Sequence, residues 1–213
     1  MILPHAIVRA SEWCGRHNVG ARGTPLIGIT HGSLTLLATH DDRAVTRDNA
    51  SDYLDAVQRI ADEIACVPFR GDKPIDRDAA QRLLRAGEAR FTSLLDRLEN
   101  HDEWTVHIDR DQPQQREPVG ERSYLSQRRD ELAVADGLPP VAARTAASLL
   151  SAITEVKPDT RLIATDHGAS LRLLLDRDTA GATIDQLHRF AQEQQIACTI
   201  IGPWPAFSFV SPL

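Results

Sequence analysis

Few residues of the chain have the types and spacing of a catalytic or metal-binding site. Asp166 and His167, together with His188, could form a metal or acid–base site, because imidazole and carboxylate groups bind metals and transfer protons near neutral pH. Asp166-His167 is followed by glycine, however, and that sequence is also typical of a hairpin turn. Asp109 and Asp111 could offer oxygen ligands to a divalent cation, but a solvated strand end is by far the better explanation of them.

Known catalytic motifs are absent from the sequence. It has no phosphate-binding loop, nucleophile elbow, zinc-protease motif or dinucleotide-binding glycine pattern. Its three cysteines, Cys14, Cys66 and Cys198, are far apart and form no metal-binding spacing. We therefore expect a protein that is not an enzyme and needs no metal or other cofactor.

Composition excludes two classes of partner and indicates a compartment. The 213 residues carry a net charge of −6 without a long basic block, which argues against nucleic-acid binding. No apolar run approaches the ~20 residues of a membrane span, and the N-terminus does not resemble a signal peptide. We expect a cytoplasmic protein with reduced thiols and no membrane contact.

The first half of the sequence predicts strands followed by two helices. Strands are expected at Ile2–Val8, Leu26–Thr30 and Leu34–Thr39, the last two joined by a hairpin at His31-Gly32. A helix capped by Asp48 or Ser51 should bury Leu54, Val57, Ile60 and Ile64, and a longer helix should begin at Asp76. A short edge strand near Val67 and an alternating strand at Glu103–Asp109 complete this half.

The second half begins after a polar, proline-containing stretch at Gln112–Pro118. Two helices are expected first, followed by a strand hairpin around Asp166-His167-Gly168, a helix capped by Thr183, and a final strand. Both halves mix helices with antiparallel strands, so the chain is predicted to have an α+β fold with two domains. The domains are placed at residues 1–111 and 118–213.

The C-terminal stretch Gly202–Val210 concentrates the large aromatic side chains. Trp204, Phe207 and Phe209 lie within six positions, although aromatic residues make up only 5% of the chain. Prolines on either side of Trp204 favour a stiff extended backbone. This segment could pack over its own domain, or it could anchor a partner protein, because aromatic side chains dominate interfaces.

Several stretches, taken together, resemble the gas-vesicle synthesis proteins of the GvpF/GvpL family. Gly202-Pro203-Trp204-Pro205-Ala206-Phe207-Ser208-Phe209 resembles the family ending Gly-Pro-Trp-Pro-Pro-Tyr-x-Phe. Gly120, Tyr124-Leu125 and Arg128-Arg129 are similar to its Gly-x-x-Tyr-Leu segment with following basic residues. Glu103–Ile108 resembles its Glu-Trp-x-Val-x-Val strand, and Pro68-Phe69-Arg70 lies where the family has Pro-Val-Arg.

The resemblance implies a fold and a function. It implies two α+β domains, the first ferredoxin-like, the second with helices and an antiparallel sheet. It also implies a non-enzymatic accessory protein of gas vesicle assembly, which binds the hydrophobic shell protein and other accessory proteins in the cytoplasm and at the gas vesicle. Trp204, Phe207, Phe209, Tyr124, Arg128 and Arg129 are then the candidates for partner binding or for locking the domain.

Two alternatives remain open from the sequence. A family member could have been repurposed as a small-ligand-binding or regulatory module, because ferredoxin-like domains often bind effectors. A metal-dependent enzyme using Asp166, His167 and His188 is the other alternative, and the metal content of the purified protein would test it.

Overall fold

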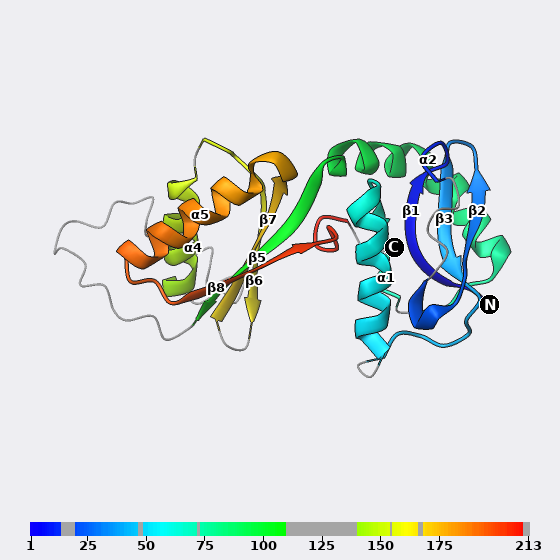
Figure 1. Cartoon of the computed structure of the whole chain (residues 1–213), viewed down its shortest axis with the longest axis horizontal. Coiled ribbons are helices and arrows are strands. Elements are labelled where there is room, and N and C mark those ends of the chain that lie inside the picture. The colour runs from blue at the N-terminus through cyan, green and yellow to red at the C-terminus, as the bar shows by residue number, and fades with distance from the viewer. Residues whose placement is uncertain are drawn as a thin grey trace. The chain divides into compact units, whose positions relative to one another are not determined.

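The computed structural model describes residues 1–13, 20–46, 49–71, 73–109, 140–153, 155–165 and 168–210. The chain divides into two compact units (Figure 1), one formed by Met1–Asp102 with Trp204–Leu213 and the other by Glu103–Pro203. The predicted linker at Gln112–Pro118 lies outside the described residues. The first unit therefore combines the N-terminal part of the chain with the C-terminal segment that begins at Trp204. The predicted domain bounds at residues 1–111 and 118–213 stay a prediction.

The first unit contains a four-stranded sheet in the order β2-β3-β1-β4. Its strands are β1 (Leu3–Arg9), β2 (Leu26–His31), β3 (Leu34–Thr39) and β4 (Val67–Pro68). The β1–β3, β1–β4 and β2–β3 pairings are antiparallel. The predicted β2–β3 hairpin is confirmed; Gly32 supplies the positive φ of 56° that its turn requires.

Two α-helices contact this sheet, α1 (Ala50–Glu63) and α2 (Arg77–Leu98), and a 3₁₀ turn, η1, covers Ala21–Gly23. The predicted start of α2 is confirmed, because the Asp76 carboxylate accepts a hydrogen bond from the Ala79 amide. The predicted inner face of α1 was wrong at Leu54, which is 39% exposed. Tyr53 is buried instead, in register with Val57 and Ile60 at helical spacing.

The second unit contains a four-stranded sheet in the order β6-β7-β5-β8. The described elements follow one another along the chain as β5 (His101–Asp109), α4 (Pro140–Ala152), β6 (Asp159–Thr165), β7 (Gly168–Asp176), α5 (Arg177–Glu193) and β8 (Cys198–Trp204). Strand, helix, two strands, helix and strand in this spatial order form the ferredoxin-like arrangement.

The α+β class predicted from the sequence is therefore confirmed for the described residues. The ferredoxin-like order, which the resemblance implied for the first domain, is found in the second unit. The first unit differs because β1, β2 and β3 all precede its first α-helix. The predicted cap at Thr183 was wrong: α5 begins at Arg177, capped by Asp176, and Thr183 lies buried within the helix with its hydroxyl donating to the Thr179 carbonyl.

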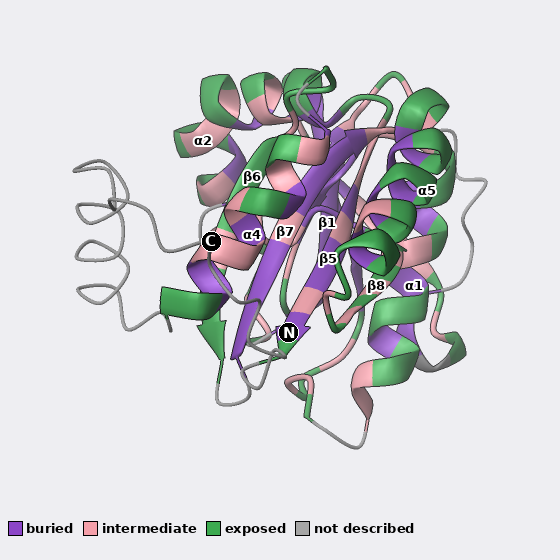
Figure 2. Cartoon of the chain, turned by 90° about the vertical axis from the view of Figure 1, so that its left-hand side faces the viewer, coloured by how far each residue is buried: buried purple, intermediate pink, exposed green. Residues whose placement is uncertain are grey.

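The core of the second unit lies between its sheet and the described helices α4 and α5. Strand β7 is buried along most of its length (Figure 2) and contacts both α4 and α5. On β5, Trp104, Val106 and Ile108 pack into this core, as their alternation predicted. Their neighbours Glu103 and Thr105 point to the other face, yet both are buried.

Candidate protein-binding surface

The aromatic C-terminal segment joins the first unit, where its three aromatic residues have different environments. Phe209 is 2% exposed, Phe207 is half-buried, and Trp204 is 39% exposed. Phe207 packs against a cluster of buried residues that includes Leu3 and Tyr53. The guanidinium carbon of Arg97 lies 5.9 Å from the centre of the Phe209 ring. The two phenylalanines therefore pack the end of the segment onto the first unit, whereas the Trp204 side chain stays partly exposed to solvent.

Backbone hydrogen bonds shape this segment after the second proline. The Phe207 amide donates to the Pro205 carbonyl at 2.6 Å, and the Phe209 amide donates to the Ala206 carbonyl at 3.1 Å. These short-range bonds form a turn, which directs Phe209 inward beside the buried Ala206 and Val210. The sequence predicted an aromatic cluster here but not which ring would be buried.

The close approach of Trp104, in the second unit, requires glycine at position 202. Its φ is 147°, and a Cβ atom at this position would lie 2.8 Å from the Trp104 ring and 3.1 Å from the Glu103 carbonyl oxygen. Only glycine satisfies both the backbone angle and the space. The strand β8 is therefore packed tightly against β5 immediately before Pro203.

The other predicted site residues are not brought to this segment by the described structure. Tyr124, Arg128 and Arg129 lie outside the described residues, so their role in partner binding stays a prediction. Asp166 and His167 are outside as well, whereas His188 is exposed on α5. In the described parts of the chain, no three His, Cys, Asp or Glu side chains are grouped so that they could hold a metal ion.

Exposed apolar side chains mark both edge strands of the second-unit sheet. Ile163 on β6 is 43% exposed, and Ile201 on β8 is 37% exposed. All residues of β6 except Leu162 are exposed. An edge strand presents backbone donors and acceptors to solvent and can therefore pair with a strand of another protein.

A polar network lies on the sheet face opposite the helices of the second unit. The Nη1 atom of Arg172 lies 3.4 Å from Glu103 Oε1 and also donates to the Thr105 hydroxyl. Beside it, the Ser170 hydroxyl lies 2.9 Å from His107 Nδ1. Nothing in the local sequence pairs Arg172 with Glu103, because the two residues are 69 positions apart. The alternation of β5 indicated only that Glu103 and Thr105 share a face.

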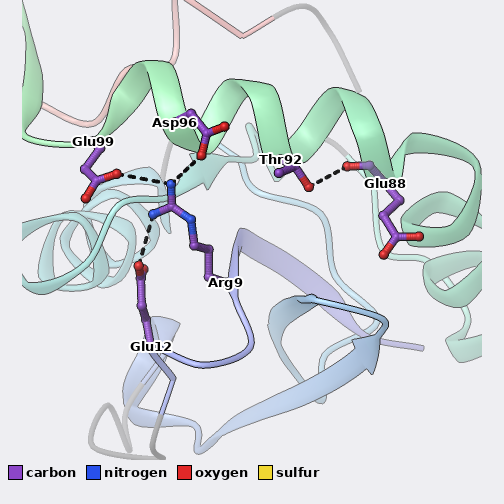
Figure 3. Close-up of polar contacts among 6 residues, drawn as sticks. All are labelled: Arg9, Glu12, Glu88, Thr92, Asp96 and Glu99. Carbon is purple, nitrogen blue, oxygen red and sulfur yellow. Dashed lines mark hydrogen bonds and ion pairs between the residues drawn. The ribbon is translucent and has the colours of Figure 1, made fainter.

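In the first unit, Arg9 connects the end of β1 to the last turn of α2 (Figure 3). Its guanidinium donates to Glu12 at 3.0 Å, to Asp96 at 2.7 Å and to Glu99 at 3.2 Å. The hydrogen bond that Arg9 donates to the Asp96 carboxylate is the main cause that raises the pKa of Arg9. Three carboxylates around one cation fix the helix end and suit a structural role.

His5 is buried in the first unit and carries no charge at neutral pH. Its Nε2 atom lies 3.2 Å from the Thr39 hydroxyl, and its ring stacks on Tyr53 with centroids 5.0 Å apart. Burial is the main reason that its pKa is lowered to about 4, with the nearby charge of Arg59 adding to the effect. The Tyr53 hydroxyl donates to the carbonyls of Pro4 and Phe69 and so connects α1 to β1 and to the end of β4.

The cysteines that the structure describes show no sign of activation. Cys66 is buried, and Cys198 is half-buried. Burial raises the pKa of the Cys198 thiol, which disfavours the nucleophilic thiolate. Among the helices that the structure describes, none has both the length and the apolar character needed to cross a bilayer.

The sequence of the chain matches the family model of the gas vesicle synthesis protein GvpL/GvpF over residues 5–211. The chain belongs to this family. No curated protein sequence matches it significantly. The fold of this GvpL/GvpF member is shared by two crystal structures whose sequences have diverged far from it.

The first of these structures is the gas vesicle protein GvpF from Anabaena sp. PCC7120, with a TM-score of 0.73 and 11% identity over 99% of this chain and 95% of that one. The second is GvpF from Microcystis aeruginosa, with a TM-score of 0.71 and 12% identity over 98% of each chain. These similarities cover both units of the present family member and establish its fold.

Proposed function

We propose that this protein is a non-enzymatic accessory protein of gas vesicle formation, which acts in the cytoplasm and at the growing vesicle. It binds the small hydrophobic shell protein and other accessory proteins before they assemble. The observation that carries the proposal is the match to the GvpL/GvpF family over residues 5–211. Binding, not catalysis, is the activity that the exposed features of the described surface support.

The shell subunit of a gas vesicle must remain free of aggregates before it is incorporated. A partner can achieve this by covering apolar surface or by pairing with strand edges that would otherwise join one another. Trp204 offers an exposed aromatic side chain on a segment held by Phe207 and Phe209. Such an anchored tryptophan loses little conformational freedom on binding, which favours a role as an interface anchor.

Co-purification with the shell protein tests this function. The tagged chain is co-expressed with the shell protein of the same gas-vesicle gene cluster, and the soluble fraction is passed over an affinity column. We expect the shell protein to elute with the tagged chain and its soluble amount to rise. A shell protein that stays in the pellet, and is absent from the eluate, would contradict the proposal.

Loss of the gene gives an independent readout. A host strain without this chain should form few or no gas vesicles, and a plasmid copy should restore them. Normal vesicle number and size in the deletion strain would argue against an assembly role.

A further inference from the structure

The outer face of helix α2 is basic, although the whole chain carries a net charge of −6. The helix has five arginines and three acidic residues. One of the acids, Asp96, accepts a hydrogen bond from Arg9 at the end of β1 (Figure 3). A second, Glu88, lies beside Gly32 in the β2–β3 turn. The surface of α2 that faces away from the sheet therefore carries mainly positive charge.

Two arginines of this face extend into solvent without a partner. The guanidinium groups of Arg90 and Arg97 lie over aromatic rings of the protein, 5.8 and 5.9 Å from the ring centres. Arg82 and Arg85 are exposed, and within the residues that the structure describes neither forms a hydrogen bond or an ion pair. Three positions apart on a helix, they point to the same side. We call Arg82 and Arg85 the basic pair.

Helix α1 of the same unit has the opposite charge. It contains four acidic residues and one arginine. Asp52 and Asp55 are exposed, and among the described residues neither has a hydrogen-bond or ion-pair partner. They are also three positions apart and lie on one side of their helix. This acidic pair therefore repeats the spacing of the basic pair with the charge reversed.

The two helices cover opposite faces of the first-unit sheet. On β1, Ala6 and Val8 pack in one cluster with Ile60 of α1. Ile7 alternates with them and so points to the other face, where it is fully buried. Helix α2 contacts all four strands, and β1 lies between α2 and α1 in both views of the chain (Figures 1 and 2). The basic and acidic pairs therefore point away from each other and cannot meet within one chain.

We propose that the outer face of α2 binds the outer face of α1 in a second copy of this chain. The basic pair then faces the acidic pair, and each arginine can hold a carboxylate by two hydrogen bonds. The complementary charge and the equal spacing of the two pairs are the observations that favour a second copy as the occupant. The inference goes beyond the proposed function, because it concerns contacts between copies and not the shell protein.

The placement of the two faces determines the kind of assembly. A contact between two different faces of the same chain is heterologous. Because the faces point in opposite directions, two copies cannot satisfy both at once, so each added copy leaves one basic and one acidic pair open at the ends. Copies should therefore add in a row and not stop at a dimer.

Light scattering of the purified protein tests this assembly. At low ionic strength the average mass should rise with protein concentration beyond that of a dimer. Added salt should return it toward the monomer, because exposed ion pairs are screened. A monomer at every concentration and ionic strength would overturn the proposal, and so would association that stops at a dimer.

Exchanging the charges identifies the surfaces. Arg82→Glu with Arg85→Glu should weaken self-association by about tenfold or more, because attraction becomes repulsion. Asp52→Lys with Asp55→Lys should do the same. A mixture of these two double variants should associate, as should a chain with all four changes, since opposite charges face each other again. If the wild type associates but neither combination does, the two faces do not pair, and the proposal is overturned.

Two further variants guard against indirect effects. Lys157→Glu with Arg189→Glu reverses two exposed basic residues of the second unit and should leave association within about twofold of the wild type. A loss equal to that of the basic-pair variant would show that only net charge matters and would overturn the assignment to α2. Asp52→Asn with Asp55→Asn avoids placing positive charge at the start of α1, and it should weaken association by about threefold or more.

The shell protein is absent from all these measurements, so their outcome is separate from the proposed function. A wild type that binds the shell protein but stays monomeric would overturn only this inference. Circular dichroism verifies that each variant is folded, which we expect because every substituted side chain is exposed.

Discussion

The Arg172 guanidinium lies 3.4 Å from the Glu103 carboxylate across the second-unit sheet, and the Glu103 side chain is only 3% exposed. A buried carboxylate needs both a counter-charge and hydrogen bonds, since burial removes its hydration. Arg172 supplies the charge and also donates to the neighbouring Thr105. The pair fixes β7 beside β5 on the face away from the helices.

Replacing Arg172 alone should therefore lower the free energy of unfolding more than replacing Arg172 and Glu103 together. Arg172→Met leaves Glu103 buried without this counter-charge, and we expect the free energy of unfolding to fall by about 3 kcal/mol. The double variant Glu103→Met with Arg172→Met should recover most of that loss, because no buried charge then remains. Urea unfolding of both variants measures the difference. Equal stability of the single and double variants would show that the two side chains are not coupled.

Acid should destabilise the first unit through His5. The pKa of His5 in the folded protein is lowered to about 4 from 6.5, so the unfolded chain binds this proton more readily. The stability that the neutral imidazole contributes is fully present above pH 6.5 and is lost as the pH falls from 6.5 toward 4. By linkage the loss attributable to this group is roughly 3 kcal/mol.

Thermal unfolding as a function of pH checks this expectation. His5→Gln keeps a polar group beside the Thr39 hydroxyl but cannot titrate. The melting temperature of this variant should therefore fall less between pH 6.5 and pH 4 than that of the wild type. If His5→Gln and the wild type lose stability in parallel, another group is responsible.

The aromatic residues of the C-terminal segment should separate into structural and binding roles. Phe209→Ala removes a buried ring and should lower the free energy of unfolding by about 3–4 kcal/mol. Trp204→Ala removes a ring that is 39% exposed, so it should cost about 1 kcal/mol or less. Urea unfolding measures both.

Trp204→Ala should nevertheless weaken binding of the shell protein in a pull-down. Trp204→Phe keeps an aromatic side chain at the same position and should bind more tightly than the alanine variant. Unchanged binding by folded Trp204→Ala would show that Trp204 is not part of the interface. The segment would then serve only to stabilise the first unit.

Two glycines offer a test of the packing between β8 and β5. Gly202→Ala introduces a Cβ 2.8 Å from the Trp104 ring at a φ of 147°. We expect a loss of about 2 kcal/mol or more, from strain and from displacement of the indole. Gly181 lies in α5 with no atom within 4 Å of its added Cβ, so Gly181→Ala should stabilise by about 0.5–1 kcal/mol. Effects of the same sign in both variants would contradict the role assigned to Gly202.

Some features of this protein were determined by the sequence alone. The alternation of β5, the β2–β3 and β6–β7 hairpins, the Asp76 cap and the concentration of aromatics at Trp204–Phe209 are all local patterns. Local patterns report the period of the backbone and the residues that turns and caps require. They suffice for the α+β class and for the family, since the family's motifs are themselves short stretches.

Only the tertiary structure decided which distant residues meet. It placed the C-terminal phenylalanines in the first unit, paired Arg172 with Glu103, buried His5 beneath Tyr53 and left β6 at the edge of its sheet. Strand order and burial depend on how helices and sheets pack, and no local period encodes that packing.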